Sequence, residues 1–228
     1  MIVTIDGPAG SGKSTAARKL AAKLGIAYLD TGAMYRALAL AALNKAIHMT
    51  DEAALVALAR SAQIELDCGP TYTRVTLDGA DVSEAIRSMA VNGATSFVAR
   101  IPDIRKLLVE KQRRIGRELG SLVTEGRDQG SVVFPDADLK FFLGAGIERR
   151  AARRLQELLA DGEEASYDEI LDNLRKRDGN DQAQWAPLLE PATAIHIDTT
   201  NMAIHEVVER MLEEVRAKGL VAPGAGRE

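Results

Sequence analysis

Residues 7–14 fit the pattern G-x-x-x-x-G-K-[ST] at every fixed position. Glycines in such a loop allow positive φ, which turns consecutive backbone N–H groups toward phosphate oxygens. Lys13 can neutralise the β- and γ-phosphates of a nucleotide, and the hydroxyl of Ser14 can ligate Mg²⁺. The residues assigned to this site are Gly7, Pro8, Ala9, Gly10, Ser11, Gly12, Lys13, Ser14 and Thr15. The pattern predicts a nucleoside triphosphate site with Mg²⁺ and leaves the phosphate acceptor unidentified.

Two arginines lie in glycine-containing turns that follow predicted strands. Arg36 comes seven residues after the end of the strand expected at 26–29, and Arg127 comes three residues after the end of the strand expected at 121–124. Arginine can hold a phosphate through two parallel hydrogen bonds, which lysine cannot do. Loops at this edge of an α/β sheet commonly carry the ligand contacts. We therefore predict that Arg36 and Arg127 bind phosphate, and that Asp128 contacts a base or ribose.

Short apolar strands alternate with amphipathic helices along the chain, which predicts an α/β fold with a parallel sheet. Strands are expected at 2–5, 26–29, 64–67, 73–77, 121–124, 139–143 and 194–197. Helices are expected at 14–24, 34–46, 50–60, 86–99, 103–118, 147–160 and 167–177, and from the last strand to about 217. Thr50 is expected to cap the third of these helices. The β-type runs around 64–77, separated by turn residues, predict a small antiparallel insert.

Composition narrows the class of protein. The chain has 228 residues, 46% of them apolar and 27% charged, with a formal net charge of −4. These values are typical of a globular protein and argue against an extended basic surface for nucleic acid. The single cysteine, Cys68, excludes an intramolecular disulfide. With neither a signal peptide nor a membrane-spanning segment expected, we predict a cytoplasmic protein that binds neither nucleic acid nor membrane.

Three classes of nucleotide-binding protein compete at this point. A GTPase would carry an Asn-Lys-x-Asp guanine reader, but Asn44-Lys45 continues with Ala46 inside a predicted helix. A remodelling ATPase would show an apolar strand ending in Asp-Glu, which we do not find. A small-molecule kinase needs arginines around a second anionic substrate and on a mobile lid, and the predicted helix at 147–160 supplies four. These are Arg149, Arg150, Arg153 and Arg154.

Several of these segments together resemble bacterial cytidylate kinases, over residues 1–215. The segments that carry the resemblance are 4–15, 29–36, 125–130, 132–137, Arg177-Asp178 and 186–188. The resemblance implies transfer of the γ-phosphoryl group of ATP to CMP or dCMP, with Mg²⁺. It also implies a three-layer P-loop kinase fold. A kinase for UMP or another metabolite, and a catalytically degraded nucleotide-binding regulator, remain as alternatives.

The same resemblance assigns roles to individual residues. Arg36 and Arg127 would hold the CMP phosphate, with Thr31 and Tyr35 lining that pocket. Ser96, Arg105 and Asp128 would recognise the cytosine, since together they offer hydrogen-bond donors and an acceptor. The remaining assignments are Arg177 and Asp181 near the ribose and phosphates, Arg153 as the lid arginine that turns inward, and catalytic roles for Lys13, Arg153 and Arg177.

The resemblance also gives a domain plan. A single kinase domain would span 1–218, with a CMP-binding region at about 31–105, its β insert at about 64–82, a helical lid at about 146–184 and a flexible tail at 219–228. We expect a monomer.

One position departs from the family pattern, because Gln184 stands where an arginine usually precedes Ala-Pro-Leu. Glutamine can donate hydrogen bonds but carries no positive charge.

Overall fold

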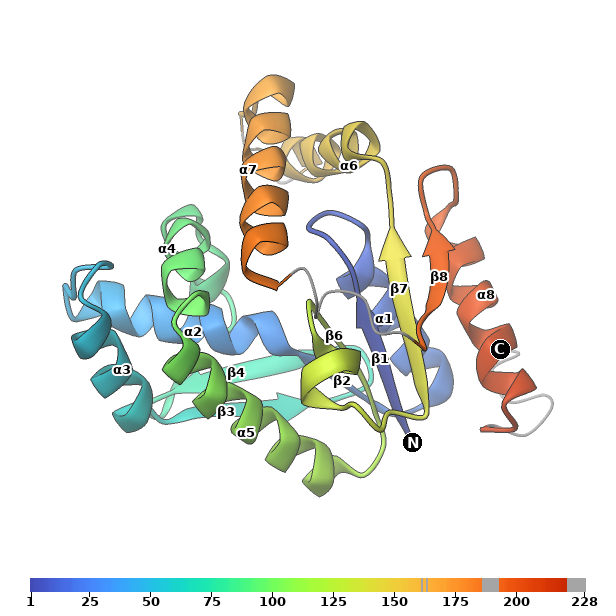
Figure 1. Cartoon of the computed structure of the whole chain (residues 1–228), viewed down its shortest axis with the longest axis horizontal. Coiled ribbons are helices and arrows are strands. Elements are labelled where there is room, and N and C mark those ends of the chain that lie inside the picture. Colours follow the sequence, from blue (N-terminus) through green and yellow to red (C-terminus); the bar gives the residue numbers. More distant parts are fainter. Residues whose placement is uncertain (161, 163, 186–192, 221–228) are drawn as a thin grey trace.

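The structure is a computed structural model that describes residues 1–160, 162, 164–185 and 193–220, with only the backbone of 182–185. Five parallel strands form its central sheet in the order β2-β6-β1-β7-β8. Their bounds are Ile2–Asp6 (β1), Ala27–Asp30 (β2), Leu122–Gly126 (β6), Leu139–Gly144 (β7) and Ile195–Asp198 (β8). The parallel sheet predicted from the sequence is therefore confirmed (Figure 1).

Helices cover both faces of this sheet and make the three layers. On one face, α1 (Lys13–Leu24) and α8 (Ile204–Ala217) pack in one apolar cluster with Val3, Ile5 and Phe141. On the other face, α2 (Thr31–Asn44) and α5 (Pro102–Leu119) share a second cluster with Leu29 and Leu122. The three-layer α/β fold is thus confirmed, because the sheet separates two apolar cores.

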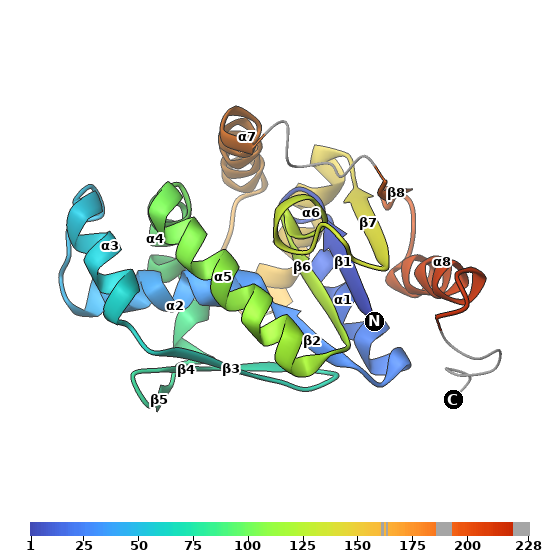
Figure 2. The ribbon, with the colours of Figure 1, turned by 60° about the horizontal axis from the view of Figure 1, so that its bottom comes forward.

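The antiparallel insert consists of β3 (Ile64–Cys68), β4 (Thr73–Leu77) and the short β5 (Ala80–Asp81). Asp78 and Gly79 have φ values of 49° and 85°, as a two-residue hairpin turn requires. Around the insert lie α3 (Glu52–Ser61), the short helix η1 (Ala85–Arg87) and α4 (Met89–Ala99). Figure 2 shows the small sheet as a separate layer below α2 and α5.

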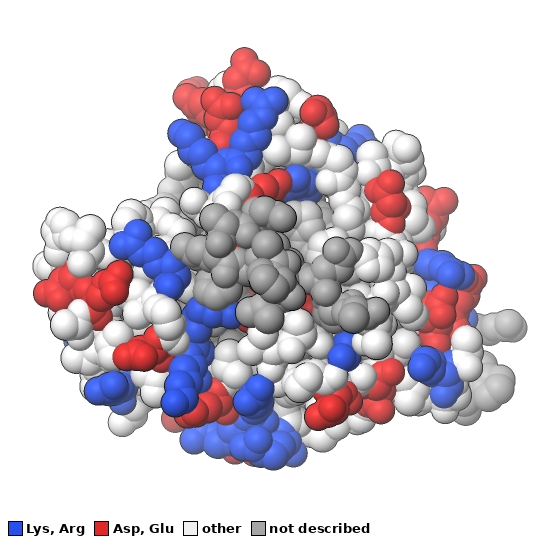
Figure 3. Space-filling model, viewed as in Figure 1, with Lys and Arg blue, Asp and Glu red and all other residues white. Residues whose placement is uncertain are grey.

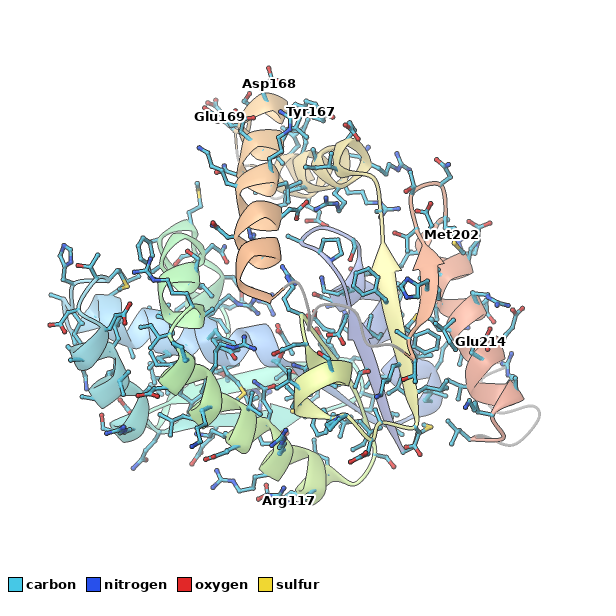
Figure 4. The ribbon with its side chains drawn as sticks, in the orientation of Figure 1. Arg117, Tyr167, Asp168, Glu169, Met202 and Glu214 are labelled. Carbon is cyan, nitrogen blue, oxygen red and sulfur yellow. The ribbon has the colours of Figure 1, made fainter. Side chains whose placement is uncertain are left out.

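Two helices stand above the carboxyl ends of the strands, in the range where the sequence predicts a lid. They are α6 (Ile147–Ala160) and α7 (Tyr167–Trp185). Helix α7 continues eight residues beyond its predicted end at 177. Tyr167, Asp168 and Glu169 mark its outer end in Figure 4, so its other end is directed toward the sheet. None of the described helices is both long and apolar enough to span a membrane.

Some predicted element ends need correction. Asp51, and not Thr50, caps α3, because its carboxylate accepts a hydrogen bond from Ala54 N at 3.0 Å. Helix α2 begins at Thr31 instead of 34, since the Asp30 carboxylate caps it through Ala33 N. The π-helical turn Gln129–Val133 (η2) was not predicted. Of the predicted tail, 221–228 lie outside the described residues.

Candidate active site

The phosphate-binding motif lies between β1 and α1, as its mechanism requires. Gly7 has a φ of 147°, and a Cβ there would lie 2.3 Å from the carbonyl oxygen of Leu143 on β7. Gly12, at φ 90°, precedes α1 without a side-chain cap, so N–H groups of the first turn of α1 can point at an anion. The Ser11 Oγ atom is buried and has no hydrogen-bond partner among the described residues. The loop therefore offers several donors that fit phosphate oxygens.

Lys13 lies inside this loop with 5% of its surface exposed. Its Nζ atom donates to the carbonyl oxygen of Pro8 at 2.7 Å. Burial lowers the pKa of Lys13, and the nearby charge of Arg127 lowers it further. A bound triphosphate would raise the pKa of Lys13 again, because adjacent negative charge favours the ammonium form.

A carboxylate that sequence reasoning missed lies beside Ser14. The Ser14 hydroxyl donates to Glu125 Oε1 at 2.7 Å, and Glu125 is 7% exposed at the end of β6. Burial, followed by the charge of Asp30, raises the pKa of Glu125. Oxygen ligands from a hydroxyl and a carboxylate, completed by substrate phosphates and water, suit Mg²⁺. Ser14 and Glu125 could thus hold Mg²⁺, although the described residues contain no group of three or more metal-binding side chains.

Arg36 lies on the acceptor side, on the first turns of α2. Its Nη2 atom donates to Asp30 Oδ2 at 2.6 Å, and the ion pair is only partly exposed. The Nε atom of Arg36 is buried without a hydrogen-bond partner in the described part of the chain. Nearby, Thr31 Oγ1 donates to the backbone oxygen of Glu125 at 2.8 Å. Arg36 therefore keeps an unused donor close to the residue that contacts Ser14.

Arg127, the other predicted phosphate ligand, is paired with α7. Its Nε atom donates to Asp181 Oδ2 at 2.8 Å. Arg177 stands one helical turn before Asp181, and its electrostatic interactions include both Arg127 and Asp181. Three of the predicted site residues are thus gathered where α7 meets the turn after β6.

The predicted base-binding residues are only partly brought together. Arg105 on α5 forms a short ion pair with Asp128, whose side chain is 8% exposed. Tyr35 is half-buried next to them, and partial removal of its hydroxyl from water raises the pKa of that hydroxyl to about 12. Ser96 lies on the exposed side of α4, where its hydroxyl reaches Gly93 O at 3.5 Å.

A second carboxylate that the sequence did not single out orients this turn. Asp6, at the end of β1, is fully buried and accepts hydrogen bonds from Gln129 N and Gly130 N, each at 2.8 Å. Burial raises its pKa to about 6. The residue that ends β1 therefore fixes the backbone immediately after Arg127 and Asp128.

The lid arginines differ from the prediction in one respect. The sequence suggests Arg153 as the inward one, but Arg150 is the one that contacts the phosphate loop. Arg150 Nη1 donates to Ala9 O at 2.9 Å and to Asp178 Oδ1 at 3.0 Å. Arg153 Nη1 instead donates to Thr199 Oγ1 at 3.1 Å, and Arg153 Nη2 reaches Met202 O, in the loop that Figure 4 labels. The side chain of Gln184 lies outside the described residues.

A cavity of about 830 Å³ borders the site, between α1, the end of β2 and the insert. Ser14 and Arg36, together with Tyr72 and Arg74 of the insert, are among the residues that line it. On the face that Figure 3 shows, acidic and basic side chains are interspersed, apart from a basic cluster at the lower edge. Apart from that cluster, this face therefore carries no broad basic surface in the part that the figure shows.

A phosphate loop between β1 and α1, two arginines in the segments that follow β2 and β6, and helices above the same edge of a parallel sheet define a phosphotransferase of the P-loop type. The comparisons agree with this class: the family model described as cytidylate kinase matches residues 3–217. The chain belongs to the cytidylate kinase family.

Curated relatives match along nearly the whole chain. A cytidylate kinase of Caldanaerobacter subterraneus subsp. tengcongensis is 49% identical over 215 residues, covering 94% of each chain. One of Geobacter sulfurreducens is 43% identical over 226 residues, covering 99% of this chain and 97% of its own. Among solved structures, an uncharacterized protein from Eubacterium ventriosum has a TM-score of 0.51 at 13% identity, covering 95% of this chain and 98% of its own. That last similarity concerns the fold alone.

Proposed function

We propose that the enzyme transfers the γ-phosphoryl group of ATP to CMP and dCMP, giving ADP with CDP or dCDP. The observation that carries the proposal is the position of Glu125 between the two halves of the site. Its carboxylate accepts from Ser14 on the donor side, and its backbone oxygen accepts from Thr31 on the acceptor side. Arg36, with its unused Nε donor, lies on the same acceptor side.

The reaction needs no general base, because the attacking oxygen belongs to an already anionic CMP phosphate. This oxygen forms a bond to the γ-phosphorus of ATP while the bond from that phosphorus to the β–γ bridging oxygen breaks, leaving ADP. Lys13 neutralises charge on the donor, and Arg36 and Arg127 orient the acceptor and balance its charge. Mg²⁺, when bound, supplies further neutralisation of the triphosphate; Ser14 and Glu125 would hold it.

The helices α6 and α7 can exclude water from the reacting phosphates. Ala9 of the phosphate loop packs with Ala151, Ile170 and Leu174 of these helices in a small apolar cluster. Arg150 adds a polar link between the phosphate loop and Asp178 of α7. Water would otherwise accept the phosphoryl group, so closure here favours transfer to CMP over hydrolysis.

The ion pair of Arg105 with Asp128 supports cytosine as the base. Cytosine presents an amino group that a carboxylate can accept from, and a carbonyl and ring nitrogen that a guanidinium can donate to. Uracil has a carbonyl in place of the amino group, which would face the Asp128 carboxylate without a hydrogen. UMP should therefore be a much poorer acceptor than CMP.

A substrate panel tests the proposal. ADP release should be measured with Mg·ATP and CMP, dCMP, UMP or AMP at matched concentrations. We expect CMP and dCMP to exceed UMP and AMP by at least about tenfold in kcat/KM. ATP binding without CMP-dependent ADP formation would instead support a nucleotide-binding regulator, and equal use of UMP would contradict the assigned base contacts. As part of the same proposal, the enzyme acts in the cytoplasm and is a monomer. Light scattering, which measures molar mass in solution, checks the monomeric state.

A further inference from the structure

The antiparallel insert is hydrogen-bonded to β2, an edge strand of the central sheet. Tyr28 N donates to Gly69 O at 2.9 Å. The hydroxyl of Thr73, the first residue of β4, donates to Tyr28 O at 2.6 Å and accepts from Asp30 N at 3.2 Å. An edge strand leaves one row of backbone groups without sheet partners, and the insert satisfies three of them here.

Thr73 uses its hydroxyl as both donor and acceptor, and its two partners are the backbone groups on either side of Leu29. Valine has nearly the same shape but can make neither hydrogen bond, whereas serine can make both. Removing the hydroxyl would leave Tyr28 O and Asp30 N unpaired in a half-buried position. The backbone of Asp30 would then lose a contact that fixes its position.

The position of Asp30 matters because its carboxylate connects the strand to Arg36. One oxygen, Oδ1, accepts from Ala33 N at 3.0 Å and caps α2, and the other accepts from Arg36 Nη2 at 2.6 Å. The guanidinium lies close over Gly32, where a Cβ would be 2.9 Å from Arg36 Nη1. Asp30 itself is 6% exposed, so its carboxylate has little freedom to adjust independently of its backbone.

We propose that Thr73 is a positioning residue for the acceptor phosphate, acting through Asp30 on Arg36. In this arrangement the insert does more than enlarge the wall of the cleft, because one of its hydroxyls determines where the phosphate-binding guanidinium stands. The inference deepens the proposed function and rests on it. Thr73 touches no reacting atom, so its effect is expected on the use of CMP and not on the use of ATP.

The test compares Thr73→Val with Thr73→Ser and with Thr76→Val as a matched control. Thr76 lies on the same strand, and no side-chain hydrogen bond involves it among those described. We expect Thr73→Val to raise the KM for CMP at least about fivefold while the KM for ATP changes less than about twofold. Thr73→Ser and Thr76→Val should both stay close to the parent enzyme. A parallel rise in the KM for ATP would indicate general loss of structure and overturn the proposal.

A double-mutant cycle with Arg36→Gln tests whether Thr73 acts through Arg36. The effect of Thr73→Val on CMP affinity, measured by calorimetry, should largely disappear in the Arg36→Gln background. Additive effects in the two backgrounds would overturn the proposal that Thr73 acts through Arg36.

If Thr73→Val does not give folded protein by circular dichroism, Thr73→Ala takes its place in both experiments with the same expected results. A parent enzyme without CMP-dependent activity would refute the proposed function, whereas an active parent with an unaffected Thr73→Val variant would refute only this inference.

Discussion

Arg127 Nε donates to Asp181 Oδ2 at 2.8 Å, and this ion pair joins the turn after β6 to helix α7. Both side chains are 25% exposed, so the pair is only partly screened by solvent. A phosphate that binds Arg127 meets a guanidinium already held by a carboxylate. Under the proposed function, binding of the acceptor and the placement of α7 would be linked through this one arginine.

Replacing Arg127 should impair use of the acceptor far more than use of the donor. We expect Arg127→Ala to raise the KM for CMP by about 10- to 100-fold, because a charge-assisted, two-pronged contact to phosphate is lost. The KM for ATP should change by less than about threefold. Steady-state kinetics with each substrate varied in turn will show this. Arg210→Ala is the matched control, since Arg210 pairs with Glu213 on the exposed surface of α8; an Arg127→Ala variant as active as this control would contradict the assignment.

Glu125 gives a prediction about the metal. Glu125→Gln keeps an oxygen that can accept from Ser14 but removes the negative charge that would help to hold Mg²⁺. We expect kcat to fall at least about tenfold and the Mg²⁺ concentration for half-maximal activity to rise. A titration of activity with MgCl₂ at saturating ATP and CMP measures both. Glu118→Gln, a change on the exposed end of α5, should leave the Mg²⁺ curve unchanged, and an identical curve for the two variants would exclude Glu125 from the metal site.

Most of the fold could be predicted because its signals are local. Most strands of the central sheet contain a short apolar stretch, and the insert is marked by β-type residues around Gly69-Pro70 and Asp78-Gly79. Errors arose at helix ends, where one capping side chain decides the boundary. Asp30 starts α2 earlier than its apolar periodicity suggests, because the periodicity reports the buried face and not the cap.

The sequence points to Arg36 and Arg127 as candidate phosphate ligands because arginines there follow predicted strands in glycine-containing turns. Glu125 and Asp6 were missed because their partners are 111 and 123 or more residues away, and no local pattern reports such pairings. The orientation of the lid arginines could not be predicted from the sequence for a related reason. Arg150 and Arg153 lie on one amphipathic helix, and only the packing of α6 against the phosphate loop decides which of them turns inward.

Gln184 stands where the family pattern usually has an arginine, and it leads to a prediction from sequence alone. Gln184→Arg should raise kcat, because a guanidinium could neutralise charge on the transferred group that glutamine cannot. The KM for ATP should change little. Steady-state rates at saturating ATP and CMP measure the effect, with Gln184→Lys to separate charge from guanidinium geometry. Unchanged or lower turnover of Gln184→Arg would show that this chain does not depend on positive charge at that position.

Asp6 links the stability of the protein to pH. Burial raises its pKa from 3.8 to about 6. The folded state therefore binds a proton more tightly than the unfolded state, so the contribution of Asp6 to stability is greatest below about pH 4 and is lost as the pH rises through 6. A shift of this size corresponds to about 3 kcal/mol. In Asp6→Asn this dependence should vanish, because the amide does not titrate in this range.

Urea unfolding of the parent enzyme and Asp6→Asn at pH 4.5 and pH 7 measures the difference. The parent's free energy of unfolding minus that of the variant should decrease as the pH rises from 4.5 to 7. At pH 7 the variant should also bind CMP more weakly. Gln129 N and Gly130 N donate to different oxygens of Asp6, and in the variant one of these oxygens becomes an NH2 group that cannot accept. The turn that carries Arg127 and Asp128 then loses one of its two anchors. Parallel stability–pH curves for the two proteins would show that Asp6 does not titrate as its burial implies.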